Sequence, residues 1–190
     1  MSNNTCTQMI PASSIDLVFS TFTQRGHEEY HGEPVSQLEH AVQAATLAKE
    51  QFPEDTTFII AAFLHDFGHL CDTTEGDMDG YGQWDHESIG AKKLLELGFS
   101  EKVASLVANH VLAKRYLVST APEYFNGLSE ASRITLEKQG GVLNLEEQHA
   151  FEADPLFQQH IALRRIDEKA KLMNRPTETA WLETLMKEHF

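Results

Sequence analysis

Imidazole and carboxylate side chains recur in this sequence at positions that helical periodicity turns toward the protein interior. His65 and Asp66 follow directly after residues 58–64, an apolar run with the sequence Phe-Ile-Ile-Ala-Ala-Phe-Leu. An isolated buried charge is very costly, so a buried carboxylate beside imidazole groups is usually paired or bound to metal. Similar inward positions, on other predicted helices, hold His40, His86, His110 and Asp167. Five helices are thus expected to aim such groups at one centre.

This donor set indicates a metal centre. Imidazole and carboxylate ligands suit divalent iron, zinc or manganese, and the mixture alone does not choose among them. One inward histidine is more often a hydrogen-bonded core residue than a ligand, but several on different helices favour a metal site. The remaining histidines fit no such pattern and are interpreted as ordinary residues: His27, His31, His149, His160 and His189.

The segments that carry these groups are predicted to be helices. Apolar residues recur at i, i+3 and i+4, whereas the alternation typical of strands never extends far. Ser36-Gln-Leu-Glu39 is a capping box at the start of the helix that carries His40. Asp85 and Ser100 are expected to cap the helices of His86 and His110. Three more helices are expected to start near Ser129, Pro155 and Thr177.

The central element is predicted to be a buried helix over residues 55–67, because this segment is apolar on all sides. Adjacent residues on a helix point about 100° apart, so His65 and Asp66 can share a site only near a helix end or distortion. We expect Gly68 to provide it. The expected fold is an all-α bundle of about seven to nine helices around this one, forming a single domain over residues 1–190.

The charge balance limits the partners. The chain has 29 acidic and 15 basic residues and a formal net charge of -14, which makes nucleic acid a poor partner. An anionic substrate would need a local basic cluster. Lys114 lies four residues after His110, and Arg164 lies three before Asp167, so both share a helix face with a candidate ligand. Taken alone, such residues are more often solvated surface charges.

Localisation is predicted from what the sequence lacks. The first residues show no basic start and apolar core, so no signal peptide is expected, and no apolar run approaches the roughly 20 residues that span a bilayer. Cys6 and Cys71 form no CxxC pair, which suits a reducing compartment. We expect a cytoplasmic protein without a membrane partner.

The order of the candidate ligands, H…HD…H…H…D, resembles the HD-domain metalloenzyme superfamily, whose members are mostly phosphohydrolases. The two histidines between the HD pair and the final aspartate resemble its dinuclear branch. Within that branch, longer strings are similar to the phosphonate carbon–phosphorus oxygenases: Tyr30-His-Gly-Glu33-Pro-Val-Ser-Gln-Leu-Glu-His40, Leu64-His-Asp-Phe-Gly-His69, Asp79-Gly-Tyr-Gly-Gln-Trp-Asp-His86, His110-Val-Leu-Ala-Lys-Arg-Tyr-Leu-Val-Ser119 and Leu128-Ser-Glu-Ala-Ser132-Arg.

The resemblance implies a mixed-valent Fe(II)/Fe(III) pair with dioxygen as co-substrate. It implies that one iron is held by His40, His65, Asp66 and Asp167, and that the other is held by Asp66, His86 and His110. Tyr30 would occupy a coordination position of the second iron until substrate displaces it. Glu33 would lie near a cationic nitrogen of the substrate. The phosphonate group would be surrounded by His69, Lys114, Ser132 and Arg164. The expected catalytic residues are Tyr30, Glu33, Asp66 and His69.

The expected reaction is oxidative cleavage of a 1-hydroxyphosphonate that carries nitrogen at carbon 2. The trimethylammonio substrate, which yields glycine betaine and phosphate, is slightly favoured over the amino substrate, which yields glycine. A quaternary ammonium group is bound by aromatic faces and negative charge, and such groups are offered by Glu28, Glu29, Tyr30, Glu33, Tyr81 and Trp84. Two alternatives remain open: a metal-dependent phosphohydrolase and a non-catalytic HD sensing module. The sequence makes no prediction of oligomeric state.

Overall fold

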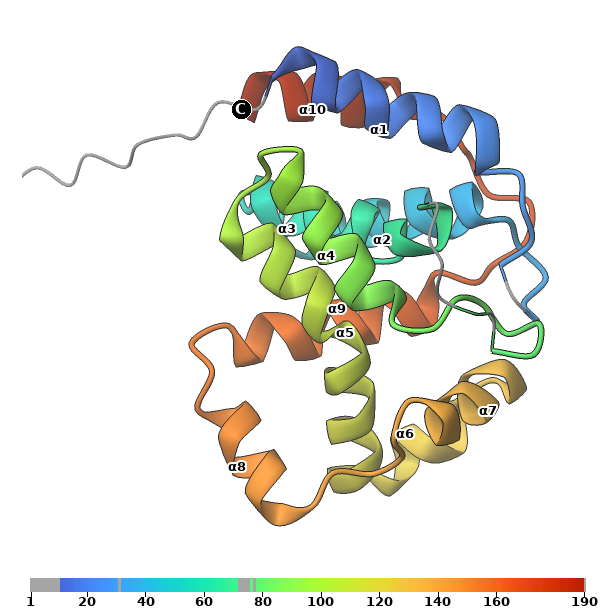
Figure 1. Cartoon of the computed structure of the whole chain (residues 1–190), viewed down its shortest axis with the longest axis vertical. Coiled ribbons are helices and arrows are strands. Elements are labelled where there is room, and N and C mark those ends of the chain that lie inside the picture. Colours follow the sequence, from blue (N-terminus) through green and yellow to red (C-terminus); the bar gives the residue numbers. More distant parts are fainter. Residues whose placement is uncertain (1–10, 31, 72–75, 77, 190) are drawn as a thin grey trace, which may run out of the picture.

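A computed structural model describes residues 11–30, 32–71, 76 and 78–189. Within these residues the chain forms ten α-helices and no β-strand, apart from an isolated bridge between Glu29 and Ser36. The predicted all-α class is confirmed, although the helix number exceeds the expected seven to nine. The elements shown in Figure 1 are α1 (Ala12–Arg25), α2 (Gln37–Gln51), α3 (Thr56–Leu64), the 3-10 helix η1 (Phe67–Leu70), α4 (His86–Glu96), α5 (Glu101–Thr120), α6 (Pro122–Gly127), α7 (Glu130–Lys138), α8 (Leu145–Glu152), α9 (Phe157–Lys169) and α10 (Ala180–His189).

Helix α3 is the centre of the main hydrophobic core. Its residues 58–64 are at most 1% exposed, and α2, α5, α9 and α10 pack around it. Helices α1 and α10 pack side by side and lie above α3 in Figure 1. The ring of Phe22 from α1 packs on Phe63 with centroids 4.5 Å apart. Each fully buried large apolar side chain stabilises this arrangement by about 1.5–3 kcal/mol.

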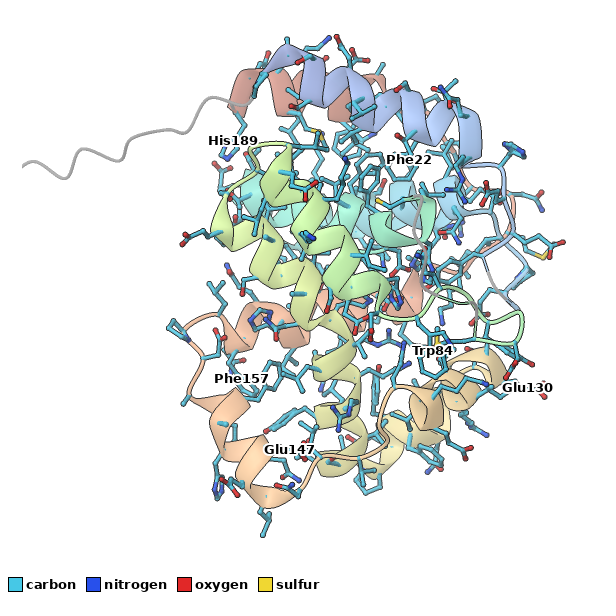
Figure 2. The ribbon with its side chains drawn as sticks, viewed as in Figure 1. Phe22, Trp84, Glu130, Glu147, Phe157 and His189 are labelled. Atoms are coloured by element: carbon cyan, nitrogen blue, oxygen red, sulfur yellow. The ribbon has the colours of Figure 1, made fainter. Side chains whose placement is uncertain are left out.

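The lower part of the molecule is built on the second half of α5, with α6 and α7 on one side and α8 on the other (Figure 1). No residue of α6, α7 or α8 belongs to the main core cluster. A separate aromatic group joins α5, α8 and α9: Tyr116, Phe151 and Phe157 have ring centroids 5.1–5.6 Å apart. Figure 2 shows Phe157 pointing into the space between these helices. The cavity described below is lined by residues of both parts.

The predicted helix starts are partly confirmed. Ser36 forms the capping box with Glu39, and the side chains of Ser100 and Ser129 each accept a backbone N–H at the start of their helices. The prediction for Asp85 is wrong: the residue precedes α4 but its side chain caps nothing, and its backbone is left-handed with φ of 52°. The last helix begins at Ala180, later than the predicted start at Thr177.

The helix that was predicted over 55–67 ends earlier, at Leu64. Asp66 has non-helical torsions (φ -105°, ψ 12°), and η1 follows it. The change of direction between His65 and Asp66 therefore comes from this helix end and not from Gly68. Gly68 has a different role, because a Cβ there would lie 1.9 Å from the backbone oxygen of His86. Only glycine lets η1 approach the start of α4 so closely.

None of the helices described is long and apolar enough to cross a membrane.

Candidate metal centre

Four histidines have one ring nitrogen fixed by a backbone carbonyl. The Nδ1 atoms of His40, His65, His86 and His110 lie 2.9, 2.8, 3.3 and 2.7 Å from carbonyl oxygens of Ala170, Ala62, Gln83 and Val107. A carbonyl only accepts hydrogen bonds, so each Nδ1 carries the proton. In the neutral imidazole, each Nε2 then presents a lone pair, which is the usual preparation of a metal-binding histidine.

These Nε2 atoms converge in two pairs on one carboxylate. His40 and His65 lie 3.4 and 3.3 Å from Oδ2 of Asp66. His86 and His110 lie 3.5 and 3.2 Å from its other oxygen, Oδ1. Asp66 thus stands between two groups that could each hold a metal ion: His40, His65 and Asp66, and Asp66, His86 and His110.

Asp167 extends the first group from α9. Its Oδ1 atom lies 3.5 Å from Nε2 of His40 and 3.8 Å from Nε2 of His65. Burial raises the pKa of Asp167, but Arg164 and the neighbouring histidines outweigh this and hold it well below the usual range. Burial likewise opposes ionisation of Asp66, yet His65 and the other histidines lower its pKa strongly. Both groups are therefore carboxylates.

The geometry fits bound cations. Oδ2 of Asp66 and Oδ1 of Asp167 are buried and have no hydrogen-bond partner. The Nε2 atoms face each other at 3.0 Å in the pair His40–His65 and at 3.1 Å in the pair His86–His110. Two neutral imidazoles with facing Nε2 lone pairs would repel, and a bound cation removes that conflict. Without a metal that cation is a proton, because burial lowers the pKa of His65 but Asp66 and Asp167 outweigh burial and raise it to about 10. The nitrogen and oxygen donors suit first-row divalent ions.

A cavity of about 50 Å³ adjoins this cluster. Such a volume holds a few waters or a small ligand, since one water occupies about 10–15 Å³ by this measure. Its walls combine metal-centre residues with groups from α5, α7, α9 and the loops: Tyr30, Glu33, Asp66, His69, Met78, Tyr81, His86, His110, Val111, Lys114, Ala131, Ser132, Thr135, Gln139, Arg164 and Lys171. Three cationic side chains among them form the local basic cluster that an anion would require in this acidic protein.

Lys114 and Arg164 are buried at the cavity rather than solvated, at 2% and 4% exposure. The Nζ atom of Lys114 donates to the hydroxyl of Thr135 at 3.0 Å. Burial, together with the charge of Arg164, lowers the pKa of Lys114 to about 7. Near neutral pH Lys114 is therefore close to half protonated, and an anion in the cavity would favour its charged form.

Arg164 is held by three protein groups. Nε donates to the Tyr124 hydroxyl at 2.7 Å, one terminal nitrogen donates to Glu168 at 2.6 Å, and the other pairs with Oδ2 of Asp167. The guanidinium thus binds the outer oxygen of a candidate metal ligand. Because it also lines the cavity, Arg164 connects the metal centre to any anion bound there.

Two aromatic side chains stack on the candidate ligands. The rings of Tyr30 and His40 are 3.9 Å apart at 16°, and the rings of His69 and His86 have the same separation and angle. Burial and the carboxylate of Asp66 raise the pKa of Tyr30 well above its usual value. His69 accepts a hydrogen bond from the backbone N–H of Gln83 at 3.2 Å. Both side chains reach the cavity.

The residues expected around a cationic nitrogen are only partly assembled. Tyr30, Glu33 and Tyr81 line the cavity, whereas Glu28, Glu29 and Trp84 are not among the lining residues. Glu28 is instead paired with Arg25 at 2.7 Å. His31 and Cys6, named in the sequence analysis, lie outside the described residues.

Sequence reasoning missed four residues that hold the predicted substrate-facing side chains, and two of them, Thr135 and Lys171, also line the cavity. Lys171, Glu168, Tyr124 and Thr135 contact the predicted substrate-facing side chains directly. Helical spacing offered a signal for two of them, because Glu168 is i+4 from Arg164 and Lys171 is i+4 from Asp167. Tyr124 and Thr135 come from other helices, and local spacing carries no information about them.

The HD domain family matches residues 27–158, more than half of the chain, so the protein belongs to the HD-domain family. Asp167 lies beyond the matched range.

Three relatives cover most of the chain. The [1-hydroxy-2-(trimethylamino)ethyl]phosphonate dioxygenase (glycine-betaine-forming) of Leisingera caerulea is 43% identical over 88% of this chain and 85% of its own length. The hydroxymethylphosphonate dioxygenase of Gimesia maris is 38% identical over 85% and 80%. The uncharacterized protein L432 of Acanthamoeba polyphaga mimivirus is 42% identical over 91% and 78%. Within the HD-domain family the chain thus belongs with the phosphonate dioxygenases, which are enzymes.

Proposed function

We propose that this protein is a di-iron oxygenase that cleaves the carbon–phosphorus bond of a 1-hydroxyphosphonate. One O2 would be consumed per substrate: the O–O bond, the C–P bond and one C–H bond at carbon 1 break, one oxygen atom goes to carbon and the other to phosphorus, and the products are phosphate, a carboxylate and a proton. The observation that carries the proposal is the convergence of four Nε2 atoms, in two pairs, on the two oxygens of Asp66 beside a basic cavity. The names of the two phosphonate dioxygenase relatives support it.

The proposed first iron is held by His40, His65, Asp66 and Asp167, and the second by Asp66, His86 and His110. The two ions, when bound, supply the redox chemistry that activates dioxygen and the positive charge that acidifies the substrate hydroxyl. Asp66 would contribute to both sites, since each of its oxygens faces a different histidine pair. Histidine Nδ1–H groups fixed on carbonyls keep the four Nε2 atoms aimed at the centre.

The basic cluster is proposed to bind the phosphonate group. Arg164 offers a planar guanidinium, already fixed by Asp167, Glu168 and Tyr124, and Lys114 offers an ammonium group. A dianion beside Lys114 favours its charged form and so restores the proton that burial disfavours. The Ser132 hydroxyl is proposed as a third contact, and His69 and Tyr30 as the aromatic walls that orient the substrate over the centre.

The nature of the group at carbon 2 is a finer prediction. The trimethylammonio substrate favoured by the sequence is supported by Tyr30, Glu33 and Tyr81 at the cavity and by the Leisingera caerulea relative. The Gimesia maris relative is named for hydroxymethylphosphonate, which has no nitrogen. The amino, trimethylammonio and hydroxymethyl substrates therefore form the test set. A cytoplasmic location also remains a prediction.

The test is simultaneous measurement of oxygen uptake and phosphate release by iron-loaded protein with each of the three substrates. The proposal requires both signals in a one-to-one ratio. Phosphate release without oxygen uptake would instead identify a phosphohydrolase. Neither signal with any substrate, in a protein that retains its metal, would favour a sensing module.

A further inference from the structure

Lys171 occupies a fixed position just beyond the end of α9. The carbonyl of the preceding residue, Ala170, accepts the Nδ1–H of His40 at 2.9 Å. The N–H of the following residue, Leu172, donates to Gln43 at 3.0 Å. Both neighbours of Lys171 are thus tied to α2, the helix that supplies a candidate metal ligand. The backbone of Lys171 is therefore held in register with the metal centre.

The Lys171 ammonium joins three separate elements at the cavity. Its Nζ atom donates to Glu33 Oε1 at 2.9 Å, to the Ser132 hydroxyl at 3.0 Å and to Glu168 Oε1 at 3.2 Å, and it has a longer contact with the Ser129 hydroxyl at 3.4 Å. These partners lie in the loop after α1, in α7 and in α9. An ammonium group has three N–H donors, so these contacts use its full capacity. The Lys171 side chain is 11% exposed, and that of Glu33 is 9% exposed.

The contacts determine what Glu33 and Ser132 can offer a substrate. Ser132 accepts a hydrogen bond from Lys171, and its own hydroxyl donates to Glu168 Oε2 at 3.5 Å, a long contact that an anionic oxygen in the cavity could replace. Lys171 and the Ser129 hydroxyl both use Oε1 of Glu33, so its second oxygen retains the remaining hydrogen-bonding capacity. Burial disfavours the charge on Lys171, but Asp167 and Glu168 outweigh burial and raise its pKa. The Lys171 side chain is thus charged at neutral pH.

We propose that Lys171 is a positioning residue that orients Glu33 and Ser132 toward the substrate from a backbone anchored on the metal centre. This inference rests on the proposed function of the cavity and adds a residue to it. Lys171 acts through the two side chains that it holds, and its three donors leave none for the phosphonate itself. A group with this role contributes to substrate binding more than to the oxidative step.

The test compares Lys171→Met, which keeps the length of the side chain and removes its charge, with Lys171→Arg. In iron-loaded Lys171→Met we expect KM for the preferred phosphonate to rise at least about tenfold, the effect of losing one charged hydrogen bond. The value of kcat should change less than about threefold, and iron content should equal that of the wild type. Lys171→Arg should recover part of the loss. Lys187→Met is the matched control, because it removes the same charge from an exposed ion pair with Glu183 on α10.

A double-mutant cycle decides whether Lys171 acts through its partners. Lys171→Met and Glu33→Gln should combine to less than the product of their separate effects on kcat/KM, and so should Lys171→Met and Ser132→Ala. Multiplicative effects in both cycles, or an unchanged KM in Lys171→Met, would overturn the proposal. If the wild type turns over no 1-hydroxyphosphonate, the proposed reaction fails, and the same cycles are measured on the dissociation constant of methylphosphonate. In that experiment, equal affinities of the wild type and Lys171→Met for methylphosphonate would overturn the positioning role.

Discussion

Replacement of Gly68 by alanine should remove one metal ion while leaving the other. The new Cβ would lie 1.9 Å from the His86 carbonyl oxygen, whereas real Cβ contacts essentially never fall below 3.0 Å. The difference, 3.0 minus 1.9 Å, means that η1 and the start of α4 must move apart by at least about 1.1 Å. Ligand atoms of a functional metal site lie within about 0.2 Å of ideal distances. A displacement of His86 several times larger than this tolerance should empty the proposed second iron site.

The measurement is iron per chain together with oxygen uptake. We expect Gly68→Ala to retain about one iron, to lose nearly all turnover and to lose about 1–3 kcal/mol of unfolding free energy from overpacking. Gly127→Ala is the matched control, because a Cβ there meets nothing within 4 Å and alanine suits a helix. Circular dichroism separates local displacement from unfolding. Two irons and normal turnover in a folded Gly68→Ala protein would refute the reasoning.

Three other changes test the site. Asp66→Ala should lose both irons, since each oxygen faces one histidine pair; two irons in the purified variant would contradict the bridging role. Arg164→Ala should raise KM and also weaken iron binding, because it leaves buried Asp167 without its cation at a cost of about 3–5 kcal/mol. A change in KM alone, with iron affinity intact, would refute the connection between Arg164 and the metal centre. Lys114→Arg tests pH dependence. Burial lowers the pKa of Lys114 to about 7, so its charge is lost as pH rises through that value, and kcat/KM of the wild type should fall on the alkaline side. Arginine stays charged, so this fall should be absent in the variant. Identical alkaline limbs in the two pH profiles would contradict it.

The parts of this structure that local sequence determines were predictable. Apolar periodicity and capping residues located α2, α5 and α7, whose starts are set by Ser36, Ser100 and Ser129. The predicted inward face of each helix also identified the histidines and aspartates that lie close together in the structure. The short helix α8 was missed although Asn144 and Glu147 form a capping box at its start. That signal was present in the sequence.

The parts that depend on packing between distant segments were not predictable. The close approach of η1 to α4 depends on contact between Gly68 and His86, which no local pattern encodes. The end of α3 at Leu64 was also missed, because the apolar run continues into His65 and Asp66 without a local stop signal. The partners of Arg164 and Lys171 come from α6, α7 and the loop after α1. The family resemblance assigned Arg164 to the substrate alone, whereas its contact with Asp167 also ties it to the candidate metal centre.

The separation of the main core from the lower helices has a consequence for how this family diversifies. Most of the candidate iron ligands come from helices of the packed core, whereas α6, α7 and the adjoining loops lie outside it. Substitutions on that outer wall of the cavity disturb few core contacts and no ligand. One wall of the cavity and the candidate ligands thus lie on elements that can change separately, which suits a group whose members are named for different substrates.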